Sequence, residues 1–227
     1  WFYGWMDAII VGHYLGSHDM GLYRTGNTFV TMIFGVIFSP LLPVLYSLFS
    51  RAQDDHRKLR AALVKVTHAI ALIAIPLGLF LFVVSGQLAD VLFGLNWRGV
   101  GPVIGIMALM HAFSWIVGAN GEIYRATGKP HVETWANAAL LAVYSVGYVV
   151  AVQYGLLIFL QTRLGLALLA MTAHIVIAKY VIGLPASNWF YWGTFGVSGA
   201  AATAVHLLGT TVTSPLADLL LSGALFA

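Results

Sequence analysis

The chain has 227 residues, of which 60% are hydrophobic and only 8% are charged, with a formal net charge of +3 at pH 7. A soluble domain carries roughly a quarter charged residues because its surface is hydrated, so this composition excludes an ordinary soluble domain. The absence of cysteine excludes disulfides and thiolate-bound metals. No basic tract is long enough for a nucleic-acid groove, and membrane lipids are the expected partners of the small positive charge.

Apolar segments recur along the whole length of the chain. A membrane-spanning helix needs about 20 largely apolar residues, and these runs lack the alternation of barrel strands. They predict an all-α, polytopic bundle of about seven transmembrane helices. The expected spans are 1–16, 25–49, 63–85, 100–121, 134–154, 156–182 and 187–212, with the start of another from 216.

Both ends of the chain lie in apolar sequence. It opens at Trp1 without an initiator methionine or the charged n-region of a signal peptide, and it closes without a polar tail. We therefore expect residues 1–227 to form a single transmembrane bundle that is truncated at both ends.

Lys and Arg residues are concentrated in the segment 51–65. The positive-inside rule predicts that this segment is cytoplasmic. Alternation then places the connection 86–100 outside, 122–133 inside, and Lys179 near the inside. Three cations do not follow this pattern: Arg24, Arg98 and Arg163.

Several short motifs follow one another in a characteristic order. Residues 7–16 read DAIIVGHYLG, an Asp, an Ile/Val-Gly step and a Leu-Gly turn, and Gly21-Leu22-Tyr23 then opens the next helix. The later motifs are Ser39-Pro40 with Pro43, Pro76-Leu77-Gly78, Phe93-Gly94-Leu95-Asn96-Trp97 and Ala126-Thr127-Gly128-Lys129-Pro130. Over residues 1–184 this series resembles the polysaccharide flippases. These are the O-antigen and exopolysaccharide exporters of the multidrug/oligosaccharidyl-lipid/polysaccharide exporter superfamily.

The resemblance implies a fold of two pseudo-symmetric lobes, of which this chain looks like the C-terminal one. It implies flipping of a polyprenyl-pyrophosphate-linked glycan across the bacterial inner membrane, for lipopolysaccharide or exopolysaccharide biosynthesis. The missing N-terminal half of the same chain would complete the cavity. Such a protein is expected to be no enzyme and to need no cofactor or metal.

The chemistry of a lipid-linked glycan indicates which residues are candidates for binding it. Pyrophosphate charge and sugar hydroxyls are costly to place in hydrocarbon, so a flippase needs a polar, cationic cavity between rocking bundles. Arg24, beside Tyr23 at the outer mouth, is the first candidate for the headgroup, although it is equally consistent with an arginine that reaches lipid phosphate. Asp7 is either a cavity carboxylate for ion or proton coupling or a helix-packing hydrogen-bond acceptor.

The remaining polar candidates also have two interpretations each. Asn27, Thr28 and Thr31 form a stripe at helical spacing that either meets sugar hydroxyls or joins helices. Arg163 is a candidate for a functional charge at depth, but the sequence favours an outer anchor if its helix begins near Leu164.

Other ionisable residues favour structural roles. Glu122 and Arg125 are expected to form an ion pair at i,i+3, although Glu122 at an inner gate remains open. Four histidines are isolated in apolar sequence and are expected to make structural hydrogen bonds: His68, His111, His174 and His206. No histidine pair has the spacing of metal ligands.

Two other functions remain open. The chain is also compatible with a drug or lipid II exporter of the same superfamily. A membrane-embedded polysaccharide polymerase or acyltransferase is disfavoured by the short loops and scattered histidines. The sequence has no P-loop, so the chain is not expected to hydrolyse ATP itself.

Overall fold

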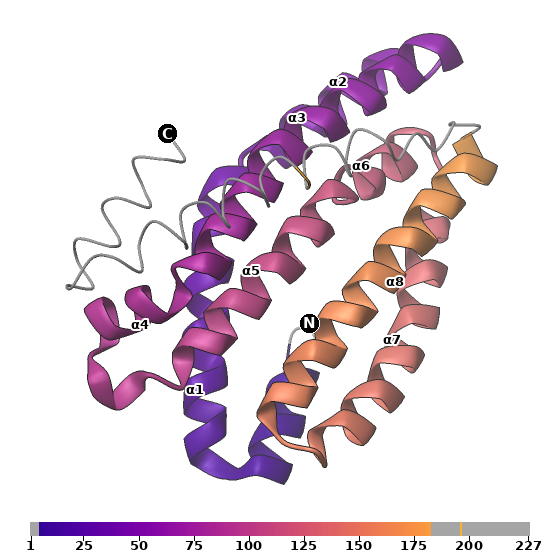
Figure 1. Cartoon of the computed structure of the whole chain (residues 1–227). Coiled ribbons are helices and arrows are strands. Elements are labelled where there is room, and N and C mark those ends of the chain that lie inside the picture. Colours follow the sequence, from indigo (N-terminus) through magenta and orange to yellow (C-terminus); the bar gives the residue numbers. More distant parts are fainter. Residues whose placement is uncertain (1–4, 183–195, 197–227) are drawn as a thin grey trace.

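The computed structural model describes residues 5–182 and residue 196. Helices make up nearly all of this part, which contains no strand, so the all-α prediction is confirmed (Figure 1). The elements are α1 Met6–Phe38, α2 Leu41–Ala52, α3 His56–Val83, α4 Ser85–Phe93, the 3-10 helix η2 Leu95–Trp97, α5 Val100–Ile116, α6 Ala119–Ala126, α7 Pro130–Val152 and α8 Leu156–Ile182.

Within the described residues, four helical segments are long and apolar enough to cross a membrane: His56–Val83, Val100–Ala126, Pro130–Val152 and Leu156–Tyr180. The bent pair α1 and α2 makes a fifth if it is counted as one span. These segments confirm the spans that the sequence predicts between residues 63 and 182, and the chain is a multi-pass membrane protein. The spans expected at 187–212 and from 216 lie outside the described residues, as does His206.

α1 consists of two helices that meet at Gly16. This residue has φ +84°, a left-handed conformation that glycine adopts without steric cost. The chain reverses there, so that 6–15 and 17–38 run side by side (Figure 1), and a side chain in one contacts a side chain in the other. The structure thus confirms the Leu-Gly turn, and it begins the second helix at residue 17 rather than near 25.

α5 lies at the centre of the bundle and packs against α1, α3, α4 and α8. α7 in turn packs against both α8 and α1, which closes a ring of helices. Small residues permit a close approach of α3 to α5: a Cβ at Gly78 would lie 2.6 Å from Ala112 Cβ. Close contact between backbones is a common way for membrane helices to associate.

The connections alternate between the two ends of the bundle. The turns at 16, 94–99 and 153–155 lie at one end, which we call the outer end, and those at 53–55 and 127–129 lie at the other, the inner end (Figure 1). This alternation agrees with the order of connections expected from the positive charges.

Asp55 caps α3 at the inner end. Its carboxylate accepts hydrogen bonds from the backbone N–H groups of Lys58 and Arg57, at 3.1 and 3.0 Å. The Lys58 N–H and ammonium together lower the pKa of Asp55 from its usual value. The carboxylate therefore keeps its charge, which favours the helix start, to lower pH than an unbonded Asp.

Candidate functional site

A buried ion pair joins the start of α1 to α8. One oxygen of Asp7, Oδ2, accepts a hydrogen bond from Arg163 Nη1 at 2.6 Å and another from the Tyr23 hydroxyl. Only 6% of Asp7 is exposed, and Tyr23 is fully buried. The Gly16 turn makes this contact possible, because it folds the helix that carries Tyr23 back along the helix that carries Asp7.

Aromatic rings surround the Arg163 guanidinium. Its central carbon lies 5.5 Å from the Tyr23 ring and 5.6 Å from the Tyr148 ring, within the range of cation–π attraction. Both tyrosines also contact the ring of Phe159. We call these five residues (Asp7, Tyr23, Tyr148, Phe159 and Arg163) the outer cluster.

The outer cluster corrects one prediction from the sequence. Arg163 is not an outer anchor, because α8 begins at Leu156, about two turns earlier, and only 11% of the Arg163 side chain is exposed. Asp7 and Arg163 each stood out as an ionisable residue in apolar sequence. Their pairing was not predicted, because a separation of 156 positions carries no spacing signal.

Arg24 is placed apart from the outer cluster. Its guanidinium lies over the Trp5 ring, 4.5 Å from the ring centre, and its side chain is half-buried. The structure therefore holds Tyr23 and Arg24, neighbours in sequence, in different environments on α1.

The polar stripe on α1 is partly exposed at depth in the bundle. Thr28 and Thr31 are exposed and Asn27 is half-buried. Thr31 Oγ1 lies 3.2 Å from His111 Nε2 on α5, which confirms a hydrogen-bonded role for this histidine. His111 is eleven residues into a span that begins at Val100, or about 17 Å from its end at 1.5 Å per residue. The stripe therefore lies near mid-membrane.

A second charged cluster lies at the inner end. Arg125 Nη1 donates to Glu122 Oε1 at 2.8 Å, which confirms the predicted i,i+3 ion pair. Arg125 also binds both carboxylate oxygens of Glu133, at 3.0 and 3.1 Å. We call these three residues the inner cluster. Glu133 was missed in the sequence, although the Gly128-Lys129-Pro130 turn was the signal that the first turn of α7 folds back against α6.

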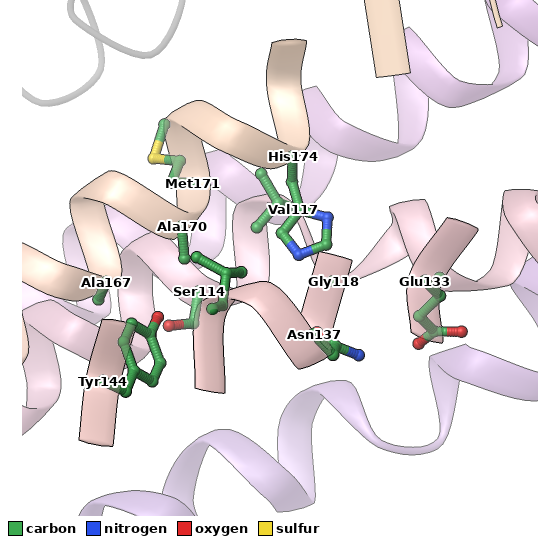
Figure 2. Close-up of a pocket in the computed structure, with 12 residues that line it drawn as sticks. Ser114, Val117, Gly118, Glu133, Asn137, Tyr144, Ala167, Ala170, Met171 and His174 are labelled. Atoms are coloured by element: carbon green, nitrogen blue, oxygen red, sulfur yellow. The ribbon is translucent and has the colours of Figure 1, made fainter. Parts of the chain in front are cut away.

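An open cavity of about 280 Å³, the inner pocket, lies beside the inner cluster between α5, α6, α7 and α8 (Figure 2). Its polar side chains are Ser114, Glu133, Asn137, Tyr144 and His174. Sequence reasoning did not find this group, since its members come from three different helices. Within the described residues, no group of three or more His, Cys, Asp or Glu side chains is placed to hold a metal ion.

Comparisons with known proteins agree with the motif series. Residues 1–102 match a family described as "Polysaccharide biosynthesis protein". Over 188 residues the chain is 23% identical to the teichuronic acid biosynthesis protein TuaB of Bacillus subtilis (strain 168), covering 82% of this chain and 38% of that protein. The resemblance to the polysaccharide flippase family is therefore confirmed.

Two further relatives extend the comparison. The succinoglycan biosynthesis transport protein ExoT of Rhizobium meliloti (strain 1021) is 29% identical over 101 residues, which are 44% of this chain and 20% of that protein. The lipopolysaccharide biosynthesis protein WzxC of Escherichia coli (strain K12) is 24% identical over 125 residues, 55% of this chain and 25% of that protein. The chain spans less than half the length of these curated relatives. No solved structure matches it significantly.

Proposed function

We propose that this chain is part of a bacterial inner-membrane protein that moves a lipid-linked polysaccharide precursor across the bilayer by alternating access. The observation that carries the proposal is the polar stripe of α1, exposed near mid-membrane in a chain related to polysaccharide biosynthesis and transport proteins. The chain would form one lobe, and the rest of the full-length protein would supply the facing wall of the passage.

The stripe supports this proposal through the free energy of burying polar groups. A hydroxyl or amide that faces hydrocarbon without a partner loses the hydrogen bonds it makes with water. Thr28 and Thr31 are exposed where the bundle would otherwise meet lipid tails, and of these Thr31 has one partner in His111. Their positions are favourable if they face water or a polar substrate in a shared cavity.

The candidate residues divide between two roles in this proposal. Arg24 would attract the anionic pyrophosphate from the outer end of the stripe, while Asn27 and Thr31 would meet glycan hydroxyls. Asp7, Tyr23 and Arg163 bind one another, so their part would be to hold the two helices of α1 against α8. The polyprenyl tail would stay in lipid, and no covalent bond changes in this step.

The proposal is tested by replacing Arg24 in the full-length protein. We expect Arg24→Ala to reduce surface polysaccharide while the amount of protein in the membrane stays the same. Arg98→Ala is a matched control, because Arg98 is an exposed arginine at the same outer end that pairs with Asp90. Normal polysaccharide in Arg24→Ala cells would remove Arg24 from the mechanism. Accumulation of unpolymerised glycan already on the outer face would instead indicate a polymerase.

A further inference from the structure

His174, which lines the inner pocket, has a ring nitrogen whose bonding is unexplained by the helices around it. Nδ1 of His174 is buried and has no hydrogen-bond partner among the described residues. The backbone carbonyl of the same residue accepts a hydrogen bond from Asn120 Nδ2 at 3.3 Å, which fixes this turn of α8 against α6. A buried polar atom without a partner costs free energy, and in native proteins it usually has a functional or solvent explanation.

The three residues of the inner cluster carry a net negative charge. Arg125 is shared between Glu122 and Glu133, so the inner cluster has one cation for two carboxylates and a formal charge of −1. The Glu122 side chain is 9% exposed and that of Glu133 is 23% exposed, while Arg125 is 48% exposed. The carboxylates are thus less hydrated than their cation, and a further positive charge nearby would be stabilised.

We propose that the inner pocket is a proton-binding site in which His174 is the acceptor and Glu133 provides the balancing charge. Histidine is the side chain whose charge ordinarily changes between about pH 5 and 8. The proposal goes beyond the transport function and does not depend on it.

The groups that face His174 support this assignment. From α7 the titratable pocket residues are Glu133 and Tyr144. α6 contributes Glu122 and Arg125 through their contact with Glu133. Ser114 of α5, and Val117 and Gly118 between α5 and α6, also line the pocket and carry no ionisable side chain. Negative charge therefore predominates on the sides that face the histidine.

Binding a proton would change the contact between α6 and α7. A charged His174 ring would compete with Arg125 for Glu133, the residue through which the first turn of α7 is held to α6. Glycine at position 121 leaves the space that this carboxylate occupies, since a Cβ there would lie 2.7 Å from Glu133 Oε1. The inner end would therefore loosen as the pH falls.

Histidine NMR of the full-length protein tests the proposal. With labelled histidine in lipid nanodiscs, one of the ring signals that titrate should disappear in His174→Gln. Glu133→Gln removes a negative charge and should lower the midpoint by about one pH unit, a tenfold loss of proton affinity. Arg125→Gln removes the positive charge and should raise the midpoint by a similar amount.

If His174→Gln does not fold, the two charge variants still test the proposal. The pocket histidine is then the ring signal whose titration midpoint falls in Glu133→Gln and rises in Arg125→Gln. The proposal is overturned if no signal responds oppositely to these changes, or if the responding signal persists in a folded His174→Gln protein. A shift that follows sodium concentration at constant pH, rather than pH at constant sodium, would also overturn it, because the pocket would then bind a metal cation.

Discussion

The outer and inner clusters both place charged side chains between helices, but they compensate these charges in different ways. In the outer cluster, one buried carboxylate and one buried guanidinium pair one-to-one, and a hydroxyl and two aromatic rings complete their environment. In the inner cluster, one half-exposed arginine is divided between two carboxylates beside an open cavity. The outer arrangement is balanced and enclosed, and the inner one is neither.

This difference indicates what each cluster can do. A buried pair is costly to break, because removing one partner leaves an uncompensated charge in a low-dielectric environment. Such a pair holds helices in one arrangement. A cluster with surplus charge and access to water can instead exchange partners at low cost, which suits a part of the protein that responds to its surroundings.

The largest expected effect comes from breaking the outer pair. Arg163→Ala should lower the free energy of unfolding by about 3–5 kcal/mol, because Asp7 would remain buried without a counter-charge. Denaturant unfolding of the purified full-length protein measures this loss. The Asp7→Ala/Arg163→Ala double variant should lose clearly less than the sum of the two single variants. Additive losses would show that the two side chains are not energetically coupled.

The same change in the inner cluster should have a smaller effect. Arg125→Ala should cost about 1 kcal/mol, near the upper end for exposed ion pairs, since solvent screens this half-exposed arginine. The same unfolding assay applies. A cost as large as that of Arg163→Ala would contradict the distinction between the two clusters.

The smallest effect is expected from crowding the inner cluster. Gly121→Ala places a Cβ against the Glu133 carboxylate, so it should weaken the contact of Glu133 with Arg125 by about 0.5 kcal/mol. Gly165→Ala in α8 is the matched control, because nothing lies within 4 Å of a Cβ there. Equal stability of the two variants would mean that the carboxylate moves aside at no cost.

Much of the fold could be predicted from the sequence, because composition and apolar run length depend on local residues alone. The spans from residue 63 to 182, the Gly16 turn and the Glu122–Arg125 pair are all determined by residues close to one another in the sequence. The predicted start of the second helix, near residue 25, was less accurate, since that helix begins at residue 17.

The candidate site was predicted only in its parts. Asp7 and Arg163 were recognised separately, as ionisable residues in apolar sequence, but a contact between α1 and α8 depends on how the helices pack. The inner pocket was missed for the same reason. Ser114, Asn137 and His174 form no recognisable pattern in the sequence, because only the packing of three helices brings them to one cavity.

The central claim, that the α1 stripe lines a water-filled passage, is tested most directly by cysteine labelling. This chain has no cysteine of its own. In a full-length protein freed of any others, Thr31→Cys and Val36→Cys each place one thiol at an exposed position of α1. Val36 is 73% exposed and should face lipid. A membrane-impermeant thiol reagent should label position 31 and spare position 36. Equal, low labelling at both positions would mean that the stripe is dry, and it would contradict the account.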